Sequence, residues 1–176
     1  MTQGSVLSAL FFERPAPEVA RKLLGAFLVC ETNGRVRRCK ITETEAYEGE
    51  EDRANHASRG RTKRTEVMYG PAGMWYVYLC YGMHNMLNVV TGAESHPAAV
   101  LIRGTEEISG PGRLTRDLGI TREFYGHAAA PENGLWLERG ESIPDSCVSK
   151  LPRVGVDYAG EWAKKEWRFL VKTENG

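Results

Sequence analysis

The sequence has little that would place it in a membrane, on a metal ion or outside the cell. It contains no run of eighteen apolar residues, so we expect no membrane-spanning helix. The first residues lack a basic segment followed by a long apolar stretch, which argues against a secretory signal. The four histidines form no H-E-x-x-H motif, and the four cysteines form no C-x-x-C pair. These absences predict a reduced cytoplasmic protein without a metal site.

The sequence also lacks an excess of charge, because 23 Lys and Arg balance 23 Asp and Glu. Such a chain is not a bulk polycation, so any affinity for nucleic acid must come from a local basic patch. Its 176 residues are enough for one domain with a sizeable core and hardly enough for two. We therefore expect a single domain over residues 1–176.

The pattern of apolar residues and turn signals predicts an α+β domain. Asn33-Gly34 is a strong hairpin signal between two apolar stretches. The segment 48–73 is polar and aperiodic, and most of 121–150 has the composition of a loop. We expect helices over residues 15–25 and 110–119, and strands over residues 26–30, 35–47, 75–81, 86–90, 98–103, 151–156 and 167–171. This order favours a mainly antiparallel sheet with peripheral helices.

Two glutamates in the expected strand 35–47 are the first candidates for chemistry. In a strand, Glu43, Glu45 and Tyr47 point to one face. Two carboxylates this close can tune each other's pKa, and such groups activate water for hydrolysis of a glycosyl bond. A solvated strand face gives the same pattern, so both interpretations stay open at this point.

The expected hairpin between residues 75 and 90 carries aromatic residues in two places. Tyr76 and Tyr78 share one face of its first strand, while Tyr81 and Met83 fall in the turn at 81–85. Apolar residues at an exposed tip are costly unless they bind something, and wedges of this kind enter the minor groove and unstack a base step. The alternative is that these side chains fill the core.

The segment 59–64 has four basic residues among six, with Gly60 and Thr62 between them. Basic side chains on a backbone that can approach closely are suited to phosphate groups. A solvated loop is the other interpretation of the same residues.

Three single residues also stand out. His56, in the long loop, either organises the loop or contacts a ligand. Arg103 ends an apolar strand, where a buried guanidinium requires a carboxylate or another acceptor. Asn88 lies inside an otherwise apolar strand, where a core amide either fixes the register or contacts a pocket.

Taken together, these segments resemble the alkyladenine DNA glycosylase family, also called the 3-methyladenine or N-methylpurine DNA glycosylases. The likeness spans nearly the whole chain, and its ordered set of motifs is highly specific. It rests on His56, Asn88 and the runs at residues 21–25, 43–47, 70–73, 76–84, 99–103, 109–114, 153–156 and 160–163.

The resemblance implies a role for each matched position of the pocket. Glu45 matches the general base that deprotonates the attacking water, and Arg103 matches the arginine that contacts this carboxylate and the water. Glu43 has no firm catalytic role in the family and is expected to be structural. The expected base-binding residues are Tyr47 and Tyr78 on the two faces of the flipped base, His56 at its edge, and Asn88, which discourages the amino group of normal guanine.

The resemblance also implies contacts with the double helix. Tyr81 matches the intercalating tyrosine that fills the gap left by the flipped nucleotide. The other positions at which the family touches the DNA backbone or groove are Thr62, Arg64, Met83 and His84. The loop from His56 to Met68 aligns only with a short gap, which leaves open which basic residue meets which phosphate. Position 84 is His where some members carry Tyr.

The implied activity is that of a monofunctional DNA glycosylase of base excision repair. It binds duplex DNA as a monomer, associates with the nucleoid, and flips 3-methyladenine, 7-methylguanine, hypoxanthine or ethenoadenine. It leaves an abasic site, because no lysine stands in the matched pocket positions, and it requires no cofactor and no metal.

Two rival functions stay open: a non-catalytic nucleic-acid binder, and a carbohydrate glycosidase that uses Glu43 and Glu45. Two observations argue against the glycosidase. Two acids on one strand cannot readily flank a sugar, and the binding of a neutral glycan does not require a basic loop.

Overall fold

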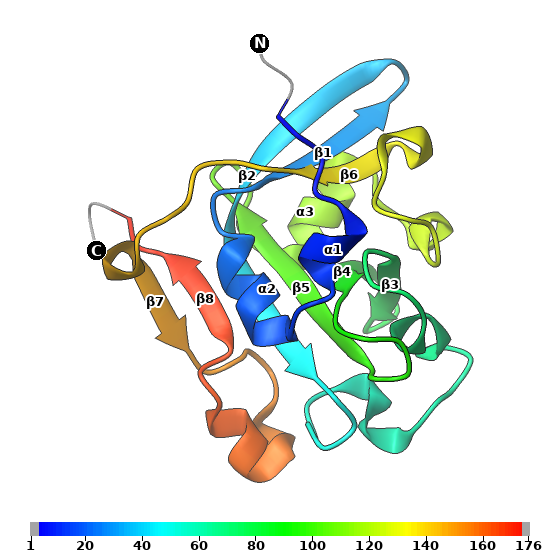
Figure 1. Cartoon of the computed structure of the whole chain (residues 1–176), viewed down its shortest axis with the longest axis vertical. Helices are drawn as coiled ribbons and strands as arrows, with labels where there is room; N and C mark the ends of the chain where they lie inside the picture. Colours follow the sequence, from blue (N-terminus) through cyan, green and yellow to red (C-terminus); the bar gives the residue numbers. More distant parts are fainter. Residues whose placement is uncertain (1–3, 174–176) are drawn as a thin grey trace.

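The computed structural model describes residues 4–173 and shows one antiparallel sheet flanked by short helices (Figure 1). Within these residues the sheet has eight strands, in the order β3-β4-β5-β2-β1-β6, and β8 pairs with both β2 and β7. The strands are β1 (Phe27–Thr32), β2 (Arg35–Glu48), β3 (Trp75–Cys80), β4 (His84–Val90), β5 (Ala98–Thr105), β6 (Leu135–Glu138), β7 (Val148–Leu151) and β8 (Arg168–Val171). The predicted α+β class with a mainly antiparallel sheet is confirmed.

Strand β2 organises the sheet because its 14 residues pair with three other strands. Its first half forms a hairpin with β1, closed by Asn33 and Gly34 with φ angles of 52° and 73°. Both residues are left-handed, as the predicted Asn-Gly turn requires. The second half of β2 lies between β5 and β8, so the segment Glu43–Glu45 is paired on both sides.

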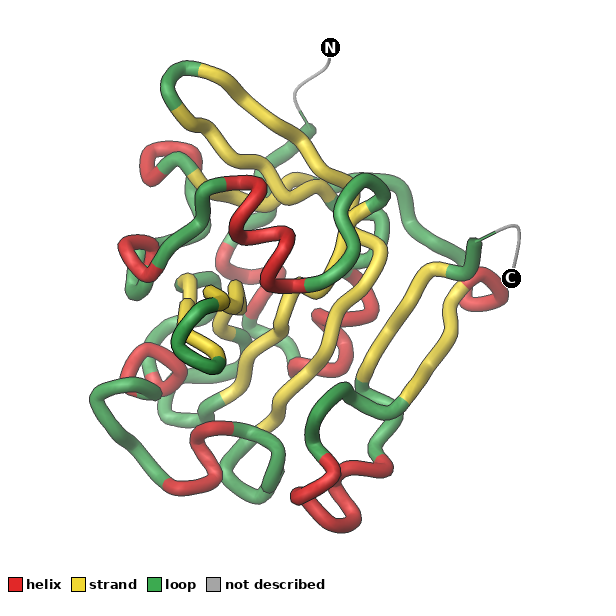
Figure 2. Tube along the Cα trace, turned by 180° about the vertical axis from the view of Figure 1, so that it is seen from behind, coloured by secondary structure: helices red, strands yellow, loops and turns green. Residues whose placement is uncertain are grey.

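The helices contribute buried side chains to one hydrophobic core on the sheet. Helices α1 (Ala9–Phe12) and α2 (Ala16–Lys22) lie in front of it in Figure 1, and the Thr44 hydroxyl donates a 2.8 Å hydrogen bond to the carbonyl of Ala20 in α2. Helix α3 (Pro111–Leu118) lies toward the viewer in Figure 2, and its Leu114 and Leu118 belong to the same core as Val19 of α2. Side chains alternate along a strand, so Glu45, next to Thr44, faces away from α2. The face toward α2 carries the main hydrophobic core, which includes Leu23, Ala46 and Ile102.

The long polar segment predicted as irregular at residues 48–73 is confirmed, and buried polar groups hold it. Asn55 donates from its side chain to the carbonyls of Gly49 and Pro97, at 2.9 and 3.1 Å. The part of the chain that the structure describes has six 3-10 helices, and the first two lie in this segment. They are η1 (His56–Arg59), η2 (Glu66–Tyr69), η3 (Arg122–Phe124), η4 (Pro131–Asn133), η5 (Asp145–Cys147) and η6 (Asp157–Lys164). The segment is therefore a fixed part of the fold.

Two predictions of local structure were wrong, and one element was missed. The expected strand at 151–156 ends at Leu151, because the next residues leave the sheet and Arg153 turns inward. The segment 121–150 is mostly loop, as predicted, but it also contains β6, a strand of four residues that pairs with β1 and that no local pattern predicts. The hairpin turn is shorter than 81–85, because Cys80 pairs with His84 and only residues 81–83 form the tip. No helix within residues 4–173 is long and apolar enough to cross a membrane.

Candidate active site

A cavity of about 490 Å³ opens on the face of the sheet that carries Glu45, and Pro111 at the start of α3 belongs to its lining. Four strands form its floor, because Tyr76, Asn88, Leu101 and Glu45 are successive partners across β3, β4, β5 and β2. Residues directly opposite each other in an antiparallel sheet share one face. The predicted residues that the cavity lining brings together are Glu45, Tyr47, His56, Arg64, Tyr78, Tyr81, Asn88 and Arg103.

Glu45 lies at the bottom of this cavity with no exposed surface. Its Oε2 accepts a hydrogen bond from the Tyr47 hydroxyl and its Oε1 accepts one from the backbone N–H of Val154, both at 2.7 Å. The Nε of Arg103 lies 3.6 Å from Oε1. A buried carboxylate is stable only when hydrogen-bonded and paired, and Glu45 has both kinds of partner.

Glu43 also forms an ion pair with Arg103. Its Oε1 accepts from Arg103 Nε at 3.1 Å and from Arg168 Nη1 at 3.2 Å. Arg103 therefore lies between two carboxylates of β2, and Arg168 on β8 supplies a second positive charge to Glu43. This arrangement orients the guanidinium of Arg103 toward Glu45.

The residue that places the Val154 amide was missed by the sequence analysis. Arg153 is buried and donates from Nη1 and Nη2 to the two oxygens of Asp52, at 2.6 and 2.9 Å. It also donates to the carbonyls of Ala46 and Trp162, and its guanidinium lies 4.9 Å from the ring centroid of Tyr47. The ion pair thus fixes the segment after β7 against the β2 strand.

The upper part of the cavity is aromatic. The ring of His56 meets that of Tyr78 edge to face, with centroids 4.5 Å apart, and Tyr76 lies 5.4 Å from Tyr78. The Tyr76 hydroxyl and His56 Nδ1 are 2.9 Å apart. Tyr47 forms the opposite part of the lining, from strand β2.

The protonation of these rings follows from their burial. Burial, with the charges of Arg64 and Arg59, lowers the pKa of His56 to about 4. Burial raises the pKa of Tyr76 to about 12 and that of Tyr78 further, and burial with the charge of Glu45 raises the pKa of Tyr47 well above its usual value. At neutral pH the cavity therefore presents a neutral imidazole and protonated phenols.

Asn88 is buried in the middle of the floor. Its side-chain amide nitrogen donates to the carbonyl of Tyr76 at 3.1 Å and to that of Met86 at 3.3 Å. The amide thus ties the two strands of the hairpin together while the side chain lines the cavity. Both interpretations that the sequence left open for this residue apply.

The tip of the β3–β4 hairpin stands beside the cavity. Tyr81 is 92% exposed and Met83 is 69% exposed, and Tyr81 has a left-handed backbone with φ of 50°. His84 lies back from the tip against the start of α3, where a Cβ atom at Gly112 would be 3.0 Å from its ring. Tyr81 also belongs to the cavity lining, so the tip and the cavity form one continuous surface.

The basic segment 59–64 divides its residues between different partners. Arg61 pairs with Glu66 and lies over the ring of Tyr69. Arg64 lines the cavity, with its guanidinium carbon 5.0 Å from the ring centroid of Tyr78. Thr62 is exposed outside the cavity and shares hydrogen bonds with Thr65. Of these residues, only Arg64 therefore joins the cavity.

The lining also includes Val154 and Tyr158, to which the sequence analysis gave no role in the cavity. The backbone N–H of Val154 carries no signature in a sequence, and Tyr158 lay in an expected turn. Among residues 4–173 no group of three or more His, Cys, Asp or Glu side chains could hold a metal ion.

The chain is similar to proteins of one enzyme family. The profile of methylpurine-DNA glycosylase (MPG) matches residues 10–110 and 104–175. A protein of Myxococcus xanthus named "Putative 3-methyladenine DNA glycosylase" is 50% identical over 171 residues, which cover 92% of this chain and 88% of the relative. A protein of the same name from Methanocella arvoryzae is 45% identical over 188 residues, covering 95% and 92%. The chain therefore belongs to the methylpurine-DNA glycosylase family.

Proposed function

We propose that this protein is a monofunctional DNA glycosylase that flips damaged purines from duplex DNA and hydrolyses their N-glycosidic bonds. The observation that carries the proposal is the position of Glu45. It is a fully buried carboxylate at the bottom of an aromatic cavity whose rim is an exposed tyrosine, Tyr81. A base inside a duplex is out of reach of a buried group, so the base must enter the cavity.

The exposed tip provides the means of extrusion. Unstacking a base costs a few kcal/mol, and a damaged or mispaired base costs less. Tyr81 enters the stack and offsets part of this cost, while Met83 and His84 contact the groove beside it. Thr62 contacts the DNA backbone, and so does Arg64 as the duplex approaches. One domain supplies both the wedge and the cavity, so the enzyme acts as a monomer.

The flipped base lies between Tyr47 and Tyr78 with His56 at its edge and Asn88 below it. Stacking on aromatic rings contributes about 1–3 kcal/mol per base and tolerates different ring substituents. This mode of recognition supports a range of substrates that includes 3-methyladenine, 7-methylguanine, hypoxanthine and ethenoadenine. The buried amide of Asn88 opposes the amino group of normal guanine.

Hydrolysis begins with a water molecule that Glu45 deprotonates. The hydroxide attacks the anomeric carbon, which acquires oxocarbenium character as the bond to the purine breaks. The negative charge of Glu45 stabilises that positive carbon, and Arg103 orients the carboxylate. The described residues that line the cavity include no lysine, so no Schiff base forms and the product is an abasic site.

The rival glycosidase function needs two carboxylates that flank a sugar. Glu43 and Glu45 instead hold the same guanidinium, that of Arg103, from one strand. The other rival function, a non-catalytic nucleic-acid binder, needs no buried carboxylate in the cavity. Measurement of base release distinguishes this binder from an enzyme.

A single-turnover base-release assay tests the proposal. Duplexes carry one hypoxanthine, one ethenoadenine or random N-methylpurines, and alkali reveals abasic sites. The wild type is compared with Glu45→Gln and with Glu132→Gln, which removes an exposed carboxylate on η4. We expect release by the wild type and Glu132→Gln, and loss of release in Glu45→Gln with DNA binding kept. Salt-sensitive binding without release from any lesion would establish the non-catalytic binder instead.

A further inference from the structure

Arg64 is a positive charge in the cavity lining that the hydrolysis step proposed above does not use. The other arginines described at the site are paired with carboxylates: Arg103 lies between Glu43 and Glu45, Arg168 pairs with Glu43, and Arg153 pairs with Asp52 outside the lining. Among the described residues no carboxylate lies within ion-pair distance of Arg64. Its guanidinium instead lies 5.0 Å from the ring centroid of Tyr78.

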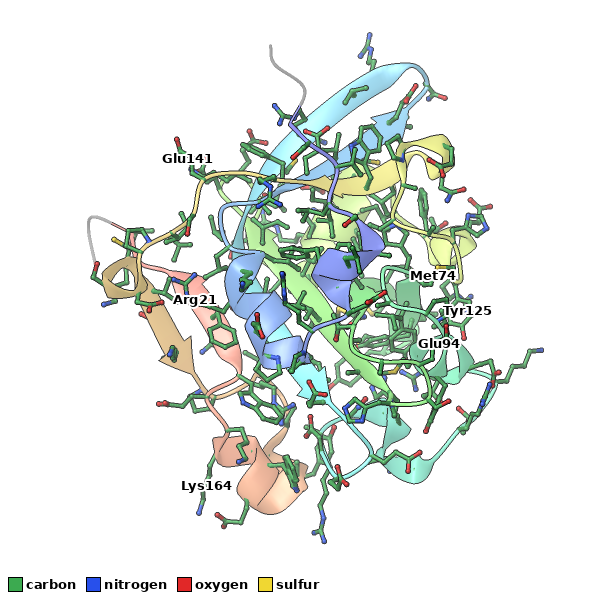
Figure 3. The ribbon with its side chains drawn as sticks, viewed as in Figure 1. Arg21, Met74, Glu94, Tyr125, Glu141 and Lys164 are labelled. Atoms are coloured by element: carbon green, nitrogen blue, oxygen red, sulfur yellow. The ribbon has the colours of Figure 1, made fainter. Side chains whose placement is uncertain are left out.

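Hydrogen bonds hold the backbone at Arg64 in place, so the position from which its side chain extends is fixed. The Tyr125 hydroxyl is 3.1 Å from the Arg64 carbonyl, 3.2 Å from that of Lys63, and accepts from the N–H of Val67 at 3.3 Å. The next residue, Thr65, is buried and hydrogen-bonds back to Thr62. Tyr125, labelled in Figure 3, thus anchors the loop from outside while Arg64 extends into the cavity lining.

The other titratable groups on this side of the cavity carry no positive charge at neutral pH. His56 is neutral because its pKa is about 4. Tyr76, with a pKa of about 12, and Tyr78, with a higher one, are weak acids. Glu45 is the base of the reaction and takes a proton rather than giving one. Arg64 is therefore the group in this part of the lining that can oppose negative charge on a base.

The two classes of damaged purine differ in the charge that the base carries as its glycosidic bond breaks. A 7-methyl- or 3-methylpurine carries a positive charge and leaves as a neutral base. Hypoxanthine is neutral, so breaking its bond to the anomeric carbon leaves the electron pair, and a negative charge, on the purine. Water supplies the hydroxyl group that joins the sugar and, through Glu45 and solvent, the proton that the purine finally takes up.

We infer that Arg64 sets the substrate class of the cavity in favour of neutral purines, by placing its guanidinium beside the base that stacks on Tyr78. A guanidinium donates hydrogen bonds and accepts none, so it pairs with a purine ring nitrogen or carbonyl that keeps a lone pair. It opposes the negative charge that develops as a neutral base leaves. It repels a base that is already positive. This inference rests on the proposed glycosylase function.

The expected effect is large enough to measure. Two unit charges about 5–6 Å apart at an effective dielectric constant of about 20 change an equilibrium by roughly 100-fold. Arg64 is exposed, and screening by solvent reduces the effect to roughly fivefold. Loss of this charge slows release of hypoxanthine and does not slow release of 7-methylguanine, which separates the effect from a general loss of activity.

The test compares Arg64→Gln and Arg64→Lys with Lys63→Gln, which removes the neighbouring exposed charge outside the cavity lining. Single-turnover rate constants at saturating enzyme are measured on duplexes with one hypoxanthine and with one 7-methylguanine. Half-saturating concentrations are measured over a range of salt. We expect Arg64→Gln to lower the hypoxanthine rate constant roughly fivefold, and to leave the 7-methylguanine rate constant equal or higher. Arg64→Lys keeps most of the hypoxanthine activity.

The controls separate the ways in which the inference can fail. Lys63→Gln is expected to weaken binding equally for both duplexes without changing their ratio of rate constants. If Arg64→Gln weakens binding in the same way and leaves that ratio unchanged, Arg64 acts only as a phosphate contact and the inference is wrong. A wild type that releases neither base overturns the proposed function itself, which is a different outcome.

Discussion

Arg153 and Asp52 form a two-pronged ion pair, with Nη···Oδ distances of 2.6 and 2.9 Å and no exposed side-chain surface on either residue. The pair joins the long loop after β2 to the segment after β7. Because Val154 follows Arg153 directly, the pair also determines where the Val154 N–H meets Glu45. A structural interaction outside the cavity thus positions a donor inside it.

Removing one partner of this pair leaves an uncompensated buried charge, which costs about 3–5 kcal/mol. We therefore expect Asp52→Asn to lower the free energy of unfolding in urea by about that amount. Base release should fall as well, because the Val154 amide loses its position. Asp145→Asn serves as the control, since Asp145 pairs with Arg21 while 85% of its side chain is exposed. An exposed pair contributes about 0–1 kcal/mol. Equal losses in the two variants would contradict this account.

The hydroxyl of Tyr47 gives a second prediction. Burial and the charge of Glu45 raise the pKa of Tyr47, so the phenol stays a donor to Glu45 Oε2 throughout the physiological range. A hydrogen bond to a charged group is worth about 1.5–3 kcal/mol. We expect Tyr47→Phe to lower the single-turnover rate constant about tenfold to 100-fold and to keep the stacking surface, so DNA affinity changes little.

The matched control for this variant is Tyr69→Phe. Tyr69 donates to Glu50 at 2.7 Å, which is a Tyr–Glu hydrogen bond of the same length outside the cavity lining. Its loss should leave base release unchanged. A comparable loss of rate in both variants would show that the effect is structural.

The sequence predicted those parts of the site that follow from strand alternation. Residues 35–47 were correctly assigned to one strand, and the period of two then places Glu45 and Tyr47 on one face, where the structure joins them by a hydrogen bond. Arg103 was expected to need an acceptor, and it has Glu43 and Glu45. These features depend on neighbours along the chain or on a strong local pattern.

What the sequence did not predict depends on contacts between distant segments. Asp52 and Arg153 are 101 residues apart, and no sequence motif around either residue identifies the other as its ion-pair partner. The basic loop shows the same limit, because only the folded chain places Arg61 on Glu66 and Arg64 beside Tyr78. Strand β6 was missed because four residues are too few to show a period.

The lowered pKa of His56 predicts a dependence of stability on pH. In the unfolded chain a histidine titrates near 6.5, whereas in the fold His56 titrates near 4. Between these values the unfolded state binds the proton and the folded state does not, so stability falls as pH decreases from about 6.5 to 4. Relative to His56→Gln, the wild type should lose about 2 kcal/mol over this range in urea unfolding.

The exposed histidine at position 127 provides the comparison for this measurement. His127→Gln should leave the pH dependence of the wild type unchanged. A wild type and a His56→Gln variant with parallel curves between pH 7 and 4 would mean that His56 is not held neutral by the fold.

Tyr81 combines a strained backbone with an exposed ring, and the two features predict opposite effects of one substitution. A tyrosine at φ of 50° is in a region that Asn and Gly adopt more readily, and the strain costs about 1 kcal/mol. With 92% of its surface exposed, the ring makes little contribution to the core. We therefore expect Tyr81→Asn to raise the free energy of unfolding by up to about 1 kcal/mol.

The same variant should release a damaged base from duplex DNA more slowly, because it has no ring to fill the stack. The loss should be smaller for a lesion inside an unpaired bubble, where little stacking is broken. Val36→Asn, which removes an exposed apolar side chain from the β1–β2 hairpin, should leave both rates unchanged. If Tyr81→Asn slows release equally from the duplex and the bubble, the tyrosine does not act as a wedge. A gain in stability with a loss confined to the duplex would show that the strain at this tip is maintained for opening the double helix.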